Sequence, residues 1–229
     1  MKEKFKSFGI TITDEQQEKF ENYYRLLVSY NERFNITAIT EREEVIEKHF
    51  IDSCLGQELL TNGMLIDVGA GGGFPSIPLK ILNPNLKMVL LEATGKKCEF
   101  LRAVVKELKL DNVEVINGRA EDLAKNENYR EKFDFCVSRA VARLNTLAEY
   151  CIPFVKVSGS FIAYKGDSNE ELVEAQNAIK ILGGKVDKVI NKSLNEAKRD
   201  IIKIDKIKPT DKKYPRGNGK ERKNPLWKK

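Results

Sequence analysis

An apolar run that ends in a carboxylate and a glycine-rich turn is the part of this sequence best suited to binding a nucleotide-like ligand. Residues 65–68 are apolar except for Asp67 near the end of the run, and glycines follow at positions 69, 71, 72 and 73. Glycine permits positive φ and lets bare backbone N–H groups approach a ligand. Because Asp67 would repel a pyrophosphate, the turn favours a cationic ligand, and S-adenosylmethionine carries sulfonium and ammonium groups.

The glycine spacing also departs from that of a dinucleotide site. Counting G-x-G-x-x-G from Gly69 places Phe74 at the third glycine, and counting from Gly71 places Ser76 there. A tight turn that binds nothing is the alternative interpretation. We predict that the cofactor contacts Asp67, Gly69, Gly71, Gly73 and Phe74.

Two later segments extend this predicted site. Glu92 ends the next strand, where a carboxylate can accept hydrogen bonds from both ribose hydroxyls, although it could also be an ordinary surface acid. The residues that follow the third strand suit adenine, because Ala120 offers a backbone N–H and Glu121 or Asp122 offers an acceptor for the amino group. A plain helix N-cap is the alternative there, above all for Asp122.

The segment after the fourth strand, residues 138–143, limits the chemistry. The Asn/Asp-Pro-Pro-Tyr/Phe turn of many amine methyltransferases is missing, and Cys136 lies within a strand, where a thiol is usually part of the core. The remaining acceptor is one that is already nucleophilic, such as guanine N7, which needs correct positioning and no general base. Arg139 either orients the guanine or a phosphate, or forms a structural ion pair.

Histidine and cysteine usage argues against metal chemistry. His49 is the only histidine and lies on the apolar face of a predicted helix, so we interpret it as a packing or capping residue and predict no metal. The four cysteines show no C-x-x-C spacing, which indicates reduced structural thiols. Tyr23, Tyr24 and Tyr30 follow a helical stripe, which favours core packing over base stacking.

The length of 229 residues and the 41% hydrophobic content suit one α/β domain with a small appendage. No apolar run approaches the roughly 20 residues of a membrane span, and the first residues lack the apolar region of a signal peptide. We therefore expect a cytoplasmic protein without membrane contact, and a monomer.

The positive charge is concentrated at the C-terminus. Residues 206–229 contain ten Lys or Arg against two acids, and this surplus of eight leaves −2 on the rest of a chain whose net charge is +6. Clustered cations suit a polyanionic partner, and a solvated tail is the equally weighted alternative.

The order of predicted elements is that of an α/β fold. Two N-terminal amphipathic helices begin at capping signatures, Thr13–Gln16 and Thr40–Glu43, and strands and helices then alternate, which specifies a parallel sheet. Predicted strands are 64–68, 87–91, 113–116, 133–137, 161–165, 186–190 and 201–207; predicted helices among them are 76–82, 96–108, 144–154 and 169–182. The last two strands follow one another directly, which indicates an antiparallel edge hairpin. The predicted organisation is an N-terminal helical section (1–62), a Rossmann-like domain (63–208) and a loop-like basic tail (209–229).

Four segments together have the order and character of the motifs of one known family: Phe34–Ile39, Lys48–Ser53, Gly69–Leu79 and Ser138–Leu144. On these segments the chain closely resembles the RsmG, or glucose-inhibited division protein B, family of bacterial 16S rRNA guanine-N7 methyltransferases. Ser76 stands where the family commonly has glycine, and the tail keeps Tyr214–Arg216 but lacks the usual Lys-Ala-Gly-Thr-Pro stretch.

The resemblance implies a class I S-adenosylmethionine-dependent methyltransferase fold, with a seven-stranded, mostly parallel sheet and an antiparallel edge strand. It implies cofactor contacts at Gly69, Phe74, Ala120, Glu121 and Arg139, and methylation of N7 of the guanine usually numbered 527. It further implies a substrate presented on 16S rRNA, a small ribosomal subunit or an assembly intermediate. Phosphate-binding candidates are Arg143, Lys212, Lys213, Arg216, Lys220, Arg222 and Lys223.

Two other functions stay open at this point. A non-catalytic RNA-binding or ribosome assembly factor could keep a relic cofactor pocket, and a small-molecule methyltransferase would make no use of the basic tail.

Overall fold

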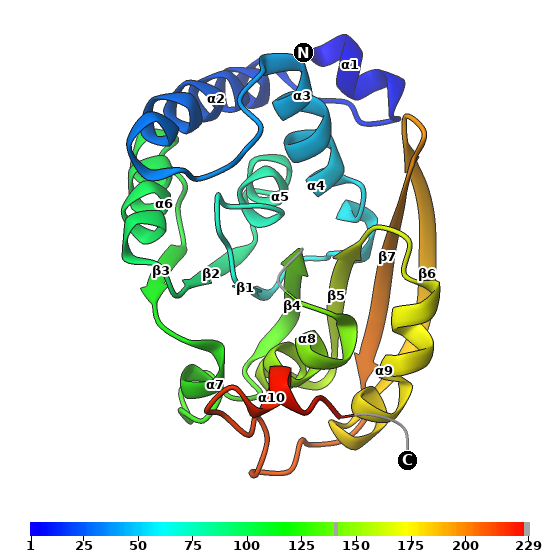
Figure 1. Ribbon diagram of the computed structural model, residues 1–229. Coiled ribbons are helices and arrows are strands. Elements are labelled where there is room, and N and C mark those ends of the chain that lie inside the picture. The colour runs from blue at the N-terminus through cyan, green and yellow to red at the C-terminus, as the bar shows by residue number, and fades with distance from the viewer. Residues whose placement is uncertain (140–141, 227–229) are drawn as a thin grey trace.

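The computed structural model describes residues 1–139 and 142–226, and within them seven strands form one sheet with helices on both faces (Figure 1). The strand order is β3-β2-β1-β4-β5-β7-β6. The strands are β1 (Met64–Val68), β2 (Lys87–Glu92), β3 (Val113–Asn117), β4 (Phe133–Arg139), β5 (Val155–Lys165), β6 (Gly184–Leu194) and β7 (Ala197–Lys206). All seven predicted strands are confirmed, and the last three strands are longer than predicted.

Five neighbouring strands are parallel, from β3 through β2, β1 and β4 to β5. The predicted hairpin at the edge is confirmed, since β6 and β7 pair antiparallel. The strand that runs against all the others is β7, which lies one position inside the edge, between β5 and β6. The parallel arrangement brings the carboxyl ends of β1, β2, β3 and β4 to one edge, where open α/β sheets bind ligands.

The helices cover both faces of the sheet (Figure 1). They are α1 (Lys2–Ser7), α2 (Asp14–Phe34), α3 (Arg42–Val45), α4 (Asp52–Cys54), α5 (Ser76–Leu82), α6 (Gly95–Glu107), α7 (Ala120–Leu123), α8 (Leu144–Cys151), α9 (Asn169–Ile181) and α10 (Lys220–Lys223), with a π-helical turn η1 (Ile46–Ile51) and the 3₁₀ turns η2 (Gln57–Leu59) and η3 (Ile152–Phe154). Successive strand residues point to opposite faces, so Leu65 joins the core under α2, α5 and α6, whereas Ile66 joins the core under α8 and α9.

The N-terminal helices share a core with the first of these faces. The capping box at the start of α2 is confirmed, because Thr13 Oγ1 accepts from the Gln16 N–H and Gln16 Oε1 accepts from the Thr13 N–H. The second capping signature is displaced by one residue, since Glu41, not Thr40, caps α3 by accepting from the Glu44 N–H. A carboxylate serves this role as well as a hydroxyl does.

The C-terminal segment was expected to be a loop-like tail, but it is packed against the domain. Arg130 donates to the backbone carbonyls of Thr210, Asp211 and Tyr214, and Tyr214 is buried. The segment continues into the short helix α10 beside α8. Its contacts are with residues far away in sequence, which local composition does not reveal.

Candidate functional site

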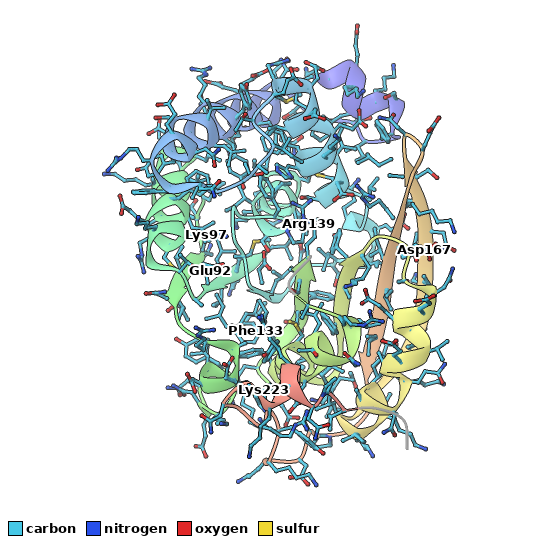
Figure 2. The ribbon with its side chains drawn as sticks, viewed as in Figure 1. Glu92, Lys97, Phe133, Arg139, Asp167 and Lys223 are labelled. Carbon is cyan, nitrogen blue, oxygen red and sulfur yellow. The ribbon has the colours of Figure 1, made fainter. Side chains whose placement is uncertain are left out.

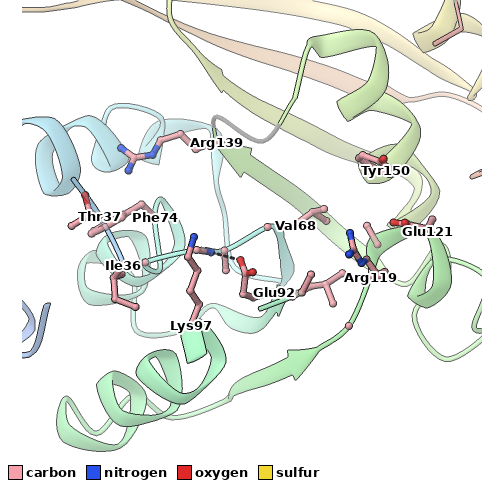
Figure 3. Close-up of a pocket in the computed structure, with 18 of the residues that line it drawn as sticks. Ile36, Thr37, Val68, Phe74, Glu92, Lys97, Arg119, Glu121, Arg139 and Tyr150 are labelled. Carbon is pink, nitrogen blue, oxygen red and sulfur yellow. Dashed lines mark hydrogen bonds between the residues drawn. The ribbon is translucent and has the colours of Figure 1, made fainter. Parts of the chain in front are cut away.

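A cavity of about 660 Å³ opens at the carboxyl edge of the sheet, next to the glycine turn. In Figure 3 the side chains of Thr37, Phe74 and Arg139 lie at one end, Glu121 and Tyr150 lie at the other, and Glu92 lies between them. The lining residues are Ile36, Thr37, His49, Val68, Gly69, Ala70, Gly71, Gly72, Phe74, Leu91, Glu92, Ala93, Lys97, Gly118, Arg119, Ala120, Glu121, Arg139, Tyr150, Gly219 and Arg222. The volume is typical of small-molecule sites.

The backbone N–H groups of the glycine turn are used within the protein. Five of them donate to protein oxygens: those of Gly69 and Ala70 to Leu91 O, that of Gly71 to Glu92 Oε2, and those of Gly73 and Phe74 to Ala70 O. This corrects the expectation of bare N–H groups facing the ligand. A pyrophosphate would find these donors occupied and a carboxylate beside them, so the turn does not have the properties of an anion site.

Three glycines of the turn are required by its geometry. Gly69, Gly71 and Gly73 have φ of +77°, +57° and +89°, a region that side-chain-bearing residues seldom adopt. A Cβ on Gly73 would lie 2.6 Å from both Ile77 Cγ1 and Tyr23 Oη. Tyr23 also donates its hydroxyl to Gly72 O, so helix α2 supports the turn from behind. Gly73 itself is a packing residue and does not line the cavity.

Glu92 is the carboxylate that faces the cavity. Its Oε2 accepts from the Gly71 N–H at 2.9 Å and its Oε1 from the Thr94 N–H at 2.8 Å, and the residue is 8% exposed. These two bonds hold the side chain in one orientation, and each oxygen keeps a further lone pair for a ligand hydroxyl. Figure 2 and Figure 3 show Glu92, at the end of β2, near Lys97 of α6. The prediction that Glu92 binds ribose stays a prediction, now with a suitable geometry.

Asp67 lies beneath the turn and not in the cavity wall. It is fully buried, its Oδ2 accepts from Ser76 Oγ at 2.6 Å, and its Oδ1 has no hydrogen-bond partner within the described chain. Burial raises the pKa of Asp67 to about 7, against the opposing effects of Ser76 and the Arg139 charge. Direct contact of Asp67 with the cofactor therefore stays a prediction, and an electrostatic role across the turn fits its position better.

Arg139 joins the cavity to a buried ion-pair group. Its Nη1 lies 2.8 Å from Asp52 Oδ2, while the other Asp52 oxygen accepts from Arg199 Nε at 2.7 Å. The guanidinium carbon lies 5.0 Å from the centre of the Phe74 ring, and the His49 ring stacks on the same phenyl group at 4.4 Å. The two interpretations of Arg139 thus coincide, because it forms a structural ion pair and also lines the cavity.

His49 has hydrogen-bond partners at both ring nitrogens. Arg139 Nη2 lies 3.2 Å from Nδ1, and Thr37 Oγ1 lies 2.8 Å from Nε2. Nδ1 also lies 3.1 Å from the Lys48 carbonyl oxygen, which can only accept, whereas the arginine can only donate, so these contacts do not select one neutral tautomer. Burial, followed by the Arg139 charge, lowers the pKa of His49 to about 4. The ring is neutral near pH 7, in keeping with a packing role.

The opposite end of the cavity contains the residues predicted to hold adenine. Ala120 and Glu121 line it, together with Tyr150 from α8. Arg119, not Asp122, is the N-cap residue of α7, and its side chain makes no capping hydrogen bond within the described part of the chain. Gly219 and Arg222 complete this end, so the C-terminal segment contributes to the cavity.

The seven cations predicted to bind RNA differ in their surroundings. Arg216 is held by Glu149 through Nε and Nη2, and Arg143 forms an exposed pair with Glu174. Lys213 pairs with Asp211, and Arg222 lines the cavity. The exposed remainder is Lys212, Lys220 and Lys223. Because Arg216 is held by the buried Glu149 carboxylate, we do not propose it as an RNA contact.

Sequence reasoning missed several residues of the site. Ile36, Thr37 and Lys97 line the cavity, although the first two lie in a segment quoted only for its resemblance. Tyr150 lies within a helix whose apolar pattern indicated core packing, and Gly219 lies in the assumed tail. Only the polar Thr37 between Ile36 and Ala38 offered a local signal.

A second cavity, of about 570 Å³, shares Arg139 and His49 with the first. It lies at the carboxyl ends of β4 and β5. Acidic and basic side chains line it: Lys48, Asp52, Lys165, Asp167, Glu171 and Arg199. Among residues 1–139 and 142–226, no cluster of three or more potential metal ligands is present. Because charges of both signs line it, the second cavity suits a polar ligand.

Comparisons with solved structures agree with this fold. TYW2 from M. jannaschii, in complex with AdoMet, matches with a TM-score of 0.57 at 17% identity, over 74% of this chain and 80% of that one. A precorrin-6y C5,15-methyltransferase from Geobacter metallireducens matches with a TM-score of 0.51 at 19% identity, over 67% of this chain and 86% of that one. At such identities the likeness concerns the fold, which is that of class I methyltransferases.

Sequence comparisons are more specific. The family model for rRNA small subunit methyltransferase G matches residues 16–202. Ribosomal RNA small subunit methyltransferase G from Brevibacillus brevis is 49% identical over 224 residues, covering 95% of this chain and 94% of the relative. That from Alkaliphilus metalliredigens is 46% identical over 232 residues, covering 99% and 97%. The chain belongs to the rRNA small subunit methyltransferase G family.

Proposed function

We propose that this protein transfers the methyl group of S-adenosylmethionine to N7 of a guanine in 16S rRNA, at the position usually numbered 527. The observation that carries the proposal is the Glu92 carboxylate at the middle of the cavity, fixed by two backbone N–H groups. A ribose bound there extends adenine toward Glu121 and the methionine part toward Gly69, Phe74 and Arg139. Family membership supplies the methyltransferase class and the rRNA substrate.

The residues present fit this cofactor. The turn offers few free donors for phosphate, and the carboxylate beside it favours positive charge. Asp67, whose buried Oδ1 has no hydrogen-bond partner among the described residues, places a second acidic group behind the turn. S-adenosylmethionine would supply an electrophilic methyl group bound to a sulfonium.

The second cavity is a suitable place for the acceptor base, because it adjoins the first at Arg139 and His49. Guanine N7 attacks the methyl carbon with its lone pair as the carbon–sulfur bond breaks, and no proton needs to be removed. The neutral His49, with both ring nitrogens occupied, need not act as a base. Catalysis then rests on alignment of the base with the methyl group.

Exposed cations near the site can hold the RNA backbone. We propose Lys212, Lys220 and Lys223 as phosphate contacts, with the exposed Arg143 able to exchange its half-buried partner Glu174 for a phosphate. Such contacts make affinity for RNA fall steeply with salt. We also expect the protein to act in the cytoplasm, where its proposed substrate is found, and to be a monomer. Both statements stay predictions. Among the helices of residues 1–139 and 142–226, none has the length and apolar character needed to cross a bilayer.

The test is transfer of tritium from labelled S-adenosylmethionine to small subunits, and to naked 16S rRNA, from cells that lack the modification. Transfer to one of these, with strand scission after reduction at a single guanine, is the expected result. Subunits that already carry the modification are the control. Absence of transfer at saturating cofactor would refute the proposal. If calorimetry then showed that the cofactor binds, the result would favour a non-catalytic RNA-binding or assembly factor. Transfer to small molecules alone would favour a small-molecule methyltransferase.

A further inference from the structure

We infer that the C-terminal segment Tyr214–Lys223 forms part of the cofactor site, and that Arg222 binds the adenine end of the cofactor. The inference rests on the proposed function only for the identity of the cofactor. The segment had been expected to be an RNA-binding tail, and its position in the fold indicates a different role.

The first observation is the composition of the cavity wall. Gly219 and Arg222 line the same end of the cavity as Arg119, Glu121 and Tyr150. Figure 1 shows α10 next to α7 and α8, the helices that provide Glu121 and Tyr150. The segment therefore supplies part of the wall at the adenine end of the cavity.

The second observation is how firmly the segment is held. Glu149 is 1% exposed, and its carboxylate accepts from the Arg216 backbone N–H at 2.9 Å, from Nε at 2.9 Å and from Nη2 at 2.8 Å. Thr146 Oγ1 donates to Glu221 O at 3.0 Å. These bonds run between α8 and the segment, so α10 is positioned by the helix that also supplies Tyr150.

The third observation is an unpaired acceptor next to this wall. Glu221 is fully buried; its Oε1 accepts from the Gly217 N–H, and its Oε2 has no hydrogen-bond partner within the described chain. Burial raises the pKa of Tyr150, the charges of Glu221 and Glu121 raise it further, and Arg222 opposes them. Acidic groups, a hydroxyl and the two guanidinium groups of Arg119 and Arg222 therefore meet at this end of the cavity.

This set of groups matches the chemistry of adenine. The exocyclic amino group donates and suits the Glu121 carboxylate or the Tyr150 hydroxyl, whereas the ring nitrogens only accept and need a donor. Arg222 supplies five N–H groups and a flat surface that can stack on a base. A phosphate, by contrast, would meet Glu121 at close range.

The experiment compares Arg222→Ala with Lys220→Ala, a cation on the same short helix that does not line the cavity. Calorimetry would measure the affinity of each full-length variant for S-adenosylmethionine and for 5′-methylthioadenosine, which lacks the amino-acid part. We expect Arg222→Ala to weaken both ligands by about tenfold, as for a lost hydrogen bond to a charged group, and Lys220→Ala to change neither by more than about twofold. Arg222→Lys should recover part of the loss, and circular dichroism would verify that each variant is folded.

Three results would overturn the inference. Equal affinity of Arg222→Ala and wild-type protein for both ligands would do so, as would a loss confined to S-adenosylmethionine, which would place Arg222 at the other end of the cofactor. A fall in RNA affinity and in its salt dependence, with cofactor affinity unchanged, would return Arg222 to the RNA surface. If wild-type protein bound neither ligand, the proposed cofactor would fall together with this inference; the methyl-transfer assay has no part in these readouts.

Discussion

Replacement of Asp67 by Asn should change how stability depends on pH. Burial raises the pKa of Asp67 from 3.8 to about 7, so between these values the folded protein holds a proton that the unfolded chain has lost. Its contribution to stability is present at low pH and is lost as pH rises through about 7. Between about pH 5 and about pH 8 the loss amounts to roughly 2.5 kcal/mol.

His49 acts in the opposite direction over the same range. Burial and the Arg139 charge lower its pKa from 6.5 to about 4, so the unfolded chain binds a proton that the folded protein does not. This contribution is present above pH 6.5 and falls by roughly 2 kcal/mol as the pH drops to about 5. The two residues nearly cancel in the wild-type protein, so its own pH profile does not isolate either one.

The readout is therefore the difference between wild-type protein and Asp67→Asn, measured by urea unfolding at several pH values from about 5 to about 8. The amide gives a constant offset, whereas the advantage of the variant should grow by roughly 2.5 kcal/mol toward high pH. His49→Gln serves as a control, because its difference from wild type should change in the opposite direction. Parallel profiles of wild type and Asp67→Asn would refute the burial argument.

Three further predictions concern the turn, the ion-pair group and the cofactor. Gly73→Ala places a Cβ against Ile77 and Tyr23 and should lower the free energy of unfolding by about 2–4 kcal/mol. A Cβ on Gly166 would meet no described atom within 4 Å, so Gly166→Ala should change this free energy by less than about 0.5 kcal/mol. Equal effects of the two substitutions would contradict the packing role of Gly73. A double-mutant cycle between Asp52 and Arg199 should give a coupling free energy of about 1–3 kcal/mol, above the roughly 0.3–0.5 kcal/mol expected for the exposed pair Glu44–Lys48. A coupling no larger than that of the exposed pair would show that burial of the ion pair adds nothing to stability. Glu92→Ala should weaken S-adenosylmethionine by about 1–3 kcal/mol in calorimetry while the exposed Glu99→Ala does not, and unchanged affinity would remove Glu92 from the ribose position.

The order of strands and helices could be predicted from the sequence because it depends on local patterns. Apolar runs bounded by turns predicted the strands, and the capping box at Thr13 predicted the start of α2. Glu92 was found for the same reason, since the end of a strand that follows a glycine turn has a known place in this architecture. The segment 46–51 continues the second predicted helix, but it forms a π-helical turn, in which the His49 ring stacks on Phe74 and the Phe50 ring packs on Phe20.

Contacts between distant segments could not be predicted in this way. The basic composition of residues 206–229 indicated a solvated or RNA-binding tail, because composition records charge but not the partner of each charge. Glu149, which holds Arg216, lies 67 residues earlier in an apolar helix, where a buried carboxylate leaves no periodic signal. Tyr150 was hidden by the same helix, so the adenine end of the site became visible only with the fold.

The preference for a cationic cofactor rests on different residues from those first proposed. Asp67 is buried below the turn, and with a pKa near 7 it carries only part of a negative charge at neutral pH. The carboxylate that faces the ligand is Glu92, which binds the Gly71 N–H and so uses one of the donors that a phosphate would need. This one hydrogen bond disfavours a pyrophosphate in two ways, because it occupies the Gly71 N–H and places the negative charge of Glu92 beside the turn. A positive ligand charge in the cavity would also draw Asp67 toward its ionised form, so cofactor binding near pH 6 should release a proton that the Asp67→Asn variant does not release.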